Sequence, residues 1–278
     1  MNYLVDYHMH STYSIDGSST IHELCQSAVS KGIKEIAITD HFEPTPGDPF
    51  YLPYDQKGYW SDITKAKQRF KGKLKIRLGV ELGQPFYFQE GTKAILRNFP
   101  YDYVIASAHK LPDGRDMSEM DYGRITEADI CELYLKQLGE LLKWEDFDCI
   151  GHLDLIKRYS AGVYGKNLSL TCQYELLTQV LNRVIAKGKG IEINTSGLRQ
   201  KPKETMPGLD VLSMYHDLGG EILTLGSDAH KAEDIGKGIN EAVIIAAQAG
   251  FRFITAFENR KPQQICITDK RAFTACHR

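Results

Sequence analysis

The sequence predicts an α/β protein: a distorted (β/α)7 barrel that carries a metal site at the carboxyl ends of its strands. Short apolar segments alternate with amphipathic helical segments along most of the chain. Continuously apolar strands suit a parallel sheet that helices cover on both faces. Six of the nine histidines come at or shortly after the end of a predicted strand. Because the carboxyl ends of barrel strands converge on one rim, these histidines are expected to share one pocket.

The first predicted strand, 3–7, leads into His8 and His10, and Asp16 follows after a polar turn. Residues i and i+2 of an extended chain lie on the same face, so both imidazoles can bind one ion. Asp16 can serve a neighbouring ion, since borderline cations accept nitrogen and oxygen ligands together. One such histidine pair is weak evidence, because surface strands produce it by chance. The prediction depends on repetition of the pattern.

The first predicted helix, 20–32, begins with a capping box. In this motif the hydroxyl of Thr20 and the carboxylate of Glu23 bind backbone N–H groups that the helix leaves free. Apolar residues then recur at helical spacing until Gly32 ends the segment. Three later segments show comparable helical patterns, and the helices predicted there are 126–143, 171–187 and 208–218.

Five further apolar segments also lead into residues that can bind a metal ion. Chance placement of this kind, repeated from strand to strand, is implausible. Segment 35–39 precedes His41, 75–80 precedes Glu81, 103–107 precedes His109, 147–151 precedes His152, and 222–225 precedes Asp228 and His230.

One domain is expected for residues 1–278, with a short C-terminal tail from about residue 266. Chains of this class fill about 250 residues as a single barrel, and the sequence has no Pro-, Gly- or Ser-rich linker. The formal net charge is −2 and no long basic segment occurs, which disfavours a nucleic-acid surface but allows a local anion site.

The expected location is the cytoplasm. The N-terminus lacks a basic segment followed by an apolar core, and Gln248 and Arg252 interrupt the apolar stretch 242–257. Neither a signal peptide nor a transmembrane helix is therefore predicted. The six cysteines lack a Cys-x-x-Cys spacing and are expected to be reduced thiols.

The strand-end motifs and three longer segments together show a family resemblance. The motifs are His8-x-His10, Thr39-Asp40-His41, Gly79-Val80-Glu81, Ser107-Ala108-His109, Gly151-His152-Leu153-Asp154 and Ser227-Asp228-Ala229-His230. Across nearly the whole chain they resemble the polymerase-and-histidinol-phosphatase (PHP) superfamily, whose fold is a TIM-like barrel. Segments 151–159, 192–199 and 259–262 look like its histidinol-phosphatase branch.

The resemblance implies an enzyme that binds two to three divalent ions, with zinc, manganese and iron equally compatible with the ligands. Glu81 would bridge two ions, and Asp228 or His230 would protonate the departing alcohol, so these three residues are the predicted catalytic residues. The implied ligand sets are His8, His10, Glu81 and Asp228 for one ion, Glu81, His109 and His152 for a second, and Asp16, His41 and His230 for a third.

Two arginines that follow the fifth and sixth predicted strands, Arg158 and Arg199, are predicted to bind the phosphate. A guanidinium fork matches phosphate geometry. The alternative is that either arginine is a solvated loop charge. The neighbours Asp40, Asp154 and Asn194 are expected to orient ligands by hydrogen bonds rather than bind metal.

The segment 42–60 follows the predicted ligand His41 and contains four prolines and six aromatic residues. Long loops often serve as functional lids, and this one could line the organic half of a substrate. Its aromatic residues could equally pack the loop onto its own barrel, and the sequence slightly favours this structural role.

Four function classes are compatible with this pattern. The first is a phosphatase that hydrolyses L-histidinol phosphate to L-histidinol and inorganic phosphate in histidine biosynthesis; the alternative substrates are another small phosphate ester, a nucleotide or a phosphodiester. The second, a nuclease or phosphodiesterase of the same superfamily, normally has a basic track or a polymerase module, and neither is visible. The third, an amidohydrolase-type deacylase, usually has a modified lysine in place of Glu81. The fourth is a metal-binding scaffold without activity, which the complete ligand set disfavours.

The predicted partner is accordingly a small phosphate monoester, with no nucleic acid and no membrane. The oligomeric state is not predictable from the sequence.

Overall fold

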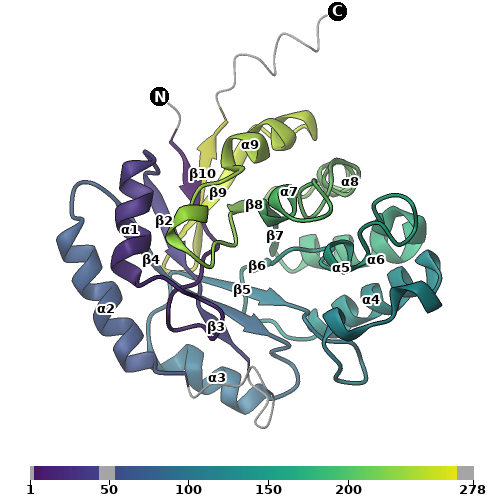
Figure 1. Cartoon of the computed structure of the whole chain (residues 1–278), viewed down its shortest axis with the longest axis horizontal. Coiled ribbons are helices and arrows are strands. Elements are labelled where there is room, and N and C mark those ends of the chain that lie inside the picture. Colours follow the sequence, from purple (N-terminus) through teal and green to yellow (C-terminus); the bar gives the residue numbers. More distant parts are fainter. Residues whose placement is uncertain (1–2, 44–53, 268–278) are drawn as a thin grey trace, which may run out of the picture.

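The computed structural model describes residues 3–43 and 54–267. In this part of the chain a sheet of parallel strands curves around a buried interior, with helices on its outside (Figure 1). The strands along the sheet are β1 (Val5–Asp6), β2 (Glu35–Ile38), β4 (Lys75–Gly83), β5 (Tyr103–Ser107), β6 (Cys149–Ile150), β7 (Gly190–Asn194) and β8 (Leu223–Gly226), in that order.

Hydrogen bonds between the first and last of these strands nearly close the sheet into a barrel. The backbone N–H of Tyr7 donates to the carbonyl of Leu225 at 2.8 Å, and that of Asp228 donates to the carbonyl of His8 at 2.8 Å. The barrel is distorted, because β1 and β6 contain only two residues each. The prediction of a distorted (β/α)7 barrel is confirmed.

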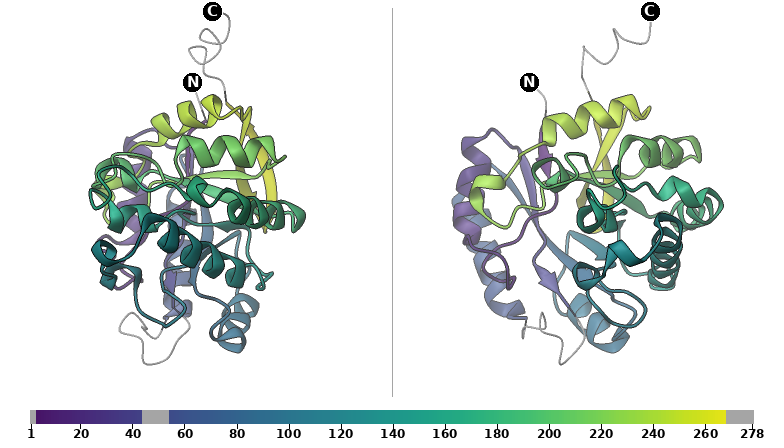
Figure 2. Two further views of the ribbon diagram at one scale, coloured as in Figure 1. Left: turned by 90° about the vertical axis from the view of Figure 1, so that its right-hand side faces the viewer. Right: turned by 45° about the vertical axis from the view of Figure 1, so that its right-hand side comes forward.

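Helices lie around the outside of the strands, as two further views show (Figure 2). The predicted capping box is present: the backbone N–H of Glu23 donates to the Thr20 hydroxyl at 3.3 Å, and that of Thr20 donates to the Glu23 carboxylate at 2.8 Å. The helices are α1 (Ile21–Ser30), α2 (Gln56–Arg69), α3 (Gln89–Asn98), α4 (Glu127–Leu141), α5 (Ile156–Ser160), α6 (Tyr174–Ala186), α7 (Ser196–Arg199), α8 (Leu209–Asp217) and α9 (Ile239–Gln248).

Strand β4 extends further than the sequence predicts. A short strand, β3 (His41–Phe42), pairs with its second half and aligns His41 with Glu81 and Phe42 with Leu82. Glu81 therefore lies within a strand rather than beyond its end. This added pairing brings two predicted metal ligands side by side.

A hairpin of β9 (Phe253–Glu258) and β10 (Lys261–Cys266) packs at the opposite end of the barrel from the histidines. At its turn, the backbone N–H of Arg260 donates to the carbonyl of Asp102, and its guanidinium lies 2.5 Å from Asp148. These aspartates come just before β5 and β6, so the hairpin covers the amino ends of the strands. The tail predicted from about residue 266 falls mainly on 268–278, which lie outside the described residues.

No helix in segments 3–43 and 54–267 is long and apolar enough to cross a membrane. The cysteines of these segments are free thiols, namely Cys25, Cys131, Cys149, Cys172 and Cys266.

Candidate metal centre

Glu81 lies at the centre of the predicted ligands and is fully buried. Its Oε1 atom is 3.0 Å from Nε2 of His152 and 3.2 Å from Nε2 of His109. Its Oε2 atom is 3.2 Å from Nε2 of His8 and 2.9 Å from Nδ1 of His41. Each carboxylate oxygen thus faces a different pair of histidines, which is the arrangement that a bridging carboxylate requires.

His8 and His10 follow β1 and lie on one face of the extended chain, as their spacing predicts. Their Nε2 atoms are 3.1 Å apart, and Nε2 of His10 is 3.4 Å from Oδ1 of Asp228. All three side chains are buried, and their ligand atoms lie close enough together to surround one ion. Buried nitrogen atoms that face each other and a carboxylate fit a cation between them.

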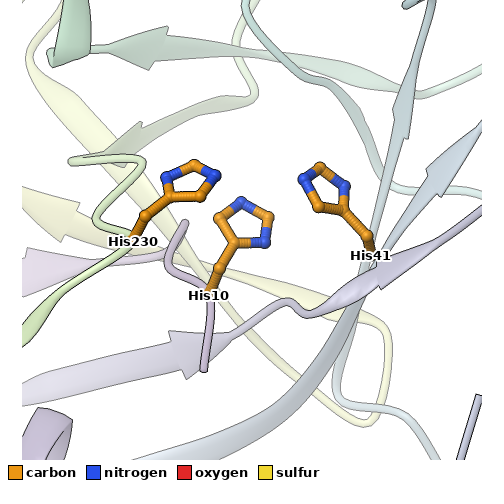
Figure 3. Close-up of side chains that lie close together, drawn as sticks. All are labelled: His10, His41 and His230. Carbon is orange, nitrogen blue, oxygen red and sulfur yellow. The ribbon is translucent and has the colours of Figure 1, made fainter. Parts of the chain in front are cut away.

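His10 also contacts two histidines nearer the surface, His41 in β3 and His230 after β8. The rings of His41 and His230 each lie against that of His10, with centroid distances of 4.1 and 4.3 Å, and their own centroids are 6.1 Å apart (Figure 3). Oδ2 of Asp16 lies 3.0 Å from Nε2 of His230 and 3.7 Å from Nε2 of His41. The structure therefore brings all nine predicted ligands to one rim of the barrel.

Two of these residues have backbone conformations that non-glycine residues rarely adopt. The φ angle is 53° at Asp228 and 25° at His152. Such conformations cost free energy and persist where the surrounding structure enforces them, which is common at functional sites. In both cases the unusual backbone directs a predicted ligand into the centre.

The charges of the centre suit the binding of cations. Burial by itself would raise the pKa of the Glu81 carboxyl, but the nearby His8, His41 and His109 outweigh burial and hold this pKa well below its usual range. Burial, together with repulsion from His41 and His230, lowers the pKa of His10 well below its usual value. At neutral pH the carboxylate is therefore charged and His10 is neutral, the forms that bind metal.

For His41 burial again opposes protonation, but the carboxylates of Glu81 and Asp16 outweigh it and raise its pKa to about 10. A cation among these carboxylates would compete with that proton, because metal binding requires neutral imidazole.

The two predicted phosphate ligands differ in position. Nη2 of Arg158 donates to Oδ2 of Asp228 at 2.8 Å, and Arg158 lines the cavity above the centre. Nη2 of Arg199 donates instead to the backbone carbonyls of Ser227 and Asp228, at 2.6 and 3.0 Å. Among the described residues, Arg199 is not one of those that line this cavity.

The segment 42–60 was predicted either to line the substrate or to pack onto the barrel. It is described only in part, because 44–53 lie outside the described residues. Tyr54 lines the cavity. Tyr59 is buried in the core, where its hydroxyl donates to the carbonyls of Ile38 and Gly79. Tyr54 and Tyr59 thus have different environments, one at the cavity and the other in the core.

Comparison with known proteins identifies the family. The model of the PHP domain family matches residues 6–196. The chain belongs to the PHP domain family. It is 32% identical to the histidinol-phosphatase of Lactococcus lactis, over 92% of this chain and 95% of that protein. It is 31% identical to a probable histidinol-phosphatase of Deinococcus radiodurans, over 95% of this chain and the whole of that protein.

A solved structure of the same family is similar along most of the chain. The crystal structure of histidinol phosphate phosphatase from Lactococcus lactis, complexed with zinc, L-histidinol and phosphate, matches with a TM-score of 0.83 and 27% identity. The match covers 95% of this chain and all of that one. Asp228 and His230 lie beyond the range of the PHP family model but within a barrel that this structure shares.

Several side chains contact the ring nitrogens of His8 and His10 that face away from the centre. Glu192 Oε1 lies 2.7 Å from Nδ1 of His8, a contact that the sequence analysis missed. Asp40 accepts a 2.7 Å hydrogen bond from Ser14, whose hydroxyl is 3.2 Å from Nδ1 of His10.

Asn194 and Asp154, the other two residues expected to orient ligands, make different contacts. Asn194 accepts a 2.6 Å hydrogen bond from the hydroxyl of Ser196, which also reaches Asp228 at 3.2 Å. Asp154, expected to orient a ligand, instead forms a 2.8 Å ion pair with the buried Lys157.

A further acid, Glu43, was also not identified from the sequence. It lies 2.8 Å from Nδ1 of His109. The spacing His41-x-Glu43 is the same i, i+2 signal that identified His8 and His10, and it could have indicated this residue.

Proposed function

We propose that this protein is a metal-dependent phosphatase that hydrolyses L-histidinol phosphate to L-histidinol and inorganic phosphate. The observation that carries the proposal is the division of the two Glu81 oxygens between separate histidine pairs, with Arg158 in the same cavity. It is supported by the similarity to a phosphatase whose structure holds zinc, L-histidinol and phosphate.

The proposed metal ligands fall into three sets, and Glu81 belongs to the first two. Bound divalent ions would neutralise the charge of the phosphoryl oxygens and lower the pKa of water toward about 7. Zinc is the metal of the Lactococcus lactis structure; the number and identity of the ions in this protein stay predictions. The proposed ligands are His8, His10, Glu81 and Asp228, then Glu81, His109 and His152, then Asp16, His41 and His230.

Arg158 would position the phosphate. Its Nη2 atom is held by Asp228, whereas its buried Nε has no hydrogen-bond partner among the described residues. A phosphate oxygen would supply the missing acceptor, and a charge-assisted bond of this kind is stronger than a neutral one. Arg199 stays a predicted phosphate ligand, and its present contacts include the carbonyls of Ser227 and Asp228 and the carboxylate of Asp234.

Asp228 or His230 would transfer the proton that the departing alcohol needs. Burial would raise the pKa of Asp228, but His8, His10, His230 and Arg158 outweigh burial and hold that pKa well below its usual range. Asp228 would therefore begin the reaction as a carboxylate, so the proton that it or His230 delivers to the alkoxide would come from the attacking water.

The substrate proposal is tested by phosphate release from L-histidinol phosphate, sugar phosphates, nucleotides and a phosphodiester. The enzyme is loaded in turn with zinc, manganese and iron. We expect the largest kcat/KM for L-histidinol phosphate, with a loss in Arg158→Ala and no change in the exposed control Arg115→Ala. Preferential cleavage of a nucleotide or a diester would leave the metal centre in place but refute the proposed substrate.

We also propose that residues 1–278 form one domain and that the protein acts in the cytoplasm. Its proposed partner is a small phosphate ester and not a nucleic acid. The contacts of the β9–β10 hairpin with Asp102 and Asp148 support the single domain, because they join the last described strands to the middle of the barrel. A single cooperative thermal transition is expected, and two separate transitions would refute it.

A further inference from the structure

A buried carboxylate, Glu43, binds the side of His109 that faces away from Glu81. Glu43 directly follows β3 and is 8% exposed. Its Oε1 atom is 2.8 Å from Nδ1 of His109, while Nε2 of the same ring is 3.2 Å from Oε1 of Glu81. The imidazole therefore lies between two carboxylates, with one nitrogen directed at each.

The position of Glu43 is fixed by Gln84. Nε2 of Gln84 donates to Oε2 of Glu43 at 3.1 Å, and Oε1 of Gln84 accepts from the backbone N–H groups of His109 and Lys110. Gln84 is 1% exposed and has a φ of 43°, a conformation that non-glycine residues rarely adopt. One side chain thus holds both the carboxylate and the backbone of the histidine that the carboxylate contacts.

The close packing around Glu43 requires a glycine. A Cβ atom at Gly83 would lie 2.0 and 2.1 Å from the two carboxylate oxygens of Glu43. With the carboxylate in this position only glycine fits at the end of β4, and the left-handed Gln84 follows it directly.

These contacts determine which nitrogen of His109 can bind a metal ion. A carboxylate at Nδ1 stabilises the tautomer that carries its proton there, so the lone pair of the neutral ring is on Nε2. That nitrogen is 3.2 Å from Oε1 of Glu81, the same oxygen that Nε2 of His152 approaches at 3.0 Å, and these two residues are the other members of the same proposed ligand set. We propose that Glu43, held by Gln84, fixes His109 in this tautomer and orientation and so sets the affinity of the ion that His109, His152 and Glu81 bind.

This inference rests on the proposed metal centre, and it makes Glu43 a positioning residue rather than a metal ligand. His41, Glu43 and His109 also lie close enough together to surround an ion. However, such an ion would have to replace the 2.8 Å contact of Glu43 with Nδ1 of His109. The two roles predict different protonation of His109 in the metal-loaded protein, because a ligand at Glu43 would need the Nδ1 lone pair.

The test compares Glu43→Gln, Glu43→Ala and Gln84→Ala with wild type and with the exposed control Glu90→Gln. Zinc content and zinc affinity are measured by competition with a chelator. Loss of a hydrogen-bond partner of a ligating histidine costs about 10–100-fold in metal affinity. We expect one ion to bind that much more weakly in Glu43→Ala, less so in Glu43→Gln, which keeps a neutral acceptor, while the remaining ions and the control are unchanged.

Nitrogen NMR of the zinc-loaded protein with labelled histidines provides the second measurement. We expect His109 to carry its proton on Nδ1 in wild type, and Glu43→Gln to recover kcat when zinc is saturating. Unchanged zinc affinity in Glu43→Ala, or a proton on Nε2 of His109 in wild type, would overturn the inference. Neither result depends on the substrate: a wild type that binds zinc as described but releases no phosphate from L-histidinol phosphate would refute only the proposed function.

Discussion

Replacement of Lys157 by methionine should strongly destabilise the fold. Lys157 is 1% exposed, and its ammonium group lies 2.8 Å from Asp154 and 3.2 Å from Glu204. Asp154 is fully buried, so the substitution leaves a carboxylate without its counter-ion inside the protein. Removal of one partner of a buried ion pair costs about 3–5 kcal/mol. For a domain of this size we expect Tm to fall by roughly 6–20 °C.

The assay is thermal and urea unfolding of Lys157→Met beside the exposed control Lys136→Met. The double variant Lys157→Met with Asp154→Asn removes both charges and should regain part of the loss. Burial raises the pKa of Asp154 although Lys157 opposes this, and loss of Lys157 should raise that pKa further. A folded-state pKa above the unfolded value destabilises the protein as the pH rises, so the loss should be larger at pH 8 than at pH 5. A change in Tm no larger than that of the control would refute the reasoning.

The remaining predictions concern the centre and the first helix. Arg158→Ala should lower kcat/KM for L-histidinol phosphate by about 10–100-fold, the equivalent of one charge-assisted hydrogen bond, and leave zinc content unchanged; a loss of zinc would contradict a role in phosphate binding. Exhaustive chelation should abolish phosphate release and added zinc or manganese should restore it, whereas full activity after verified metal removal would refute metal dependence. Thr20→Ala should lower the free energy of unfolding by about 1 kcal/mol through loss of the helix cap, and an unchanged urea midpoint would show that the cap is dispensable.

The convergence of the proposed metal ligands was predictable because it follows from two general rules. Residues i and i+2 of a strand share a face, which is the relation of His8 and His10. The carboxyl ends of barrel strands converge, which places His152 and His230 on the same rim although they are far apart in sequence. Thr20 and Glu23 were similarly predictable, because a capping box depends only on residues within one helical turn.

Features that depend on tertiary contacts were not predictable in this way. The extension of β4 past Glu81 arises from its pairing with β5 on one side and β3 on the other, and the two residues of β3 give no strand signal of their own in the sequence. Helix α2 was missed because four basic side chains and Gly58 obscure the few residues that it buries. The role of Glu43 was hidden for the same reason, since it depends on His109 from a different segment. Asp154 pairs with Lys157 only three residues along the chain, but the complete burial of this ion pair depends on tertiary packing.

The most direct test of the central claim is phosphate release from L-histidinol phosphate by zinc-loaded wild type and Glu81→Gln. Glu81 is the residue that joins the histidine pairs, and loss of the stabilisation that bound metal provides is worth several kcal/mol in the transition state. We predict steady turnover by wild type and a loss of about 1,000-fold or more in the variant. No release by zinc-loaded wild type, or turnover retained in Glu81→Gln, would contradict the assignment of this rim as a metal-dependent phosphatase centre.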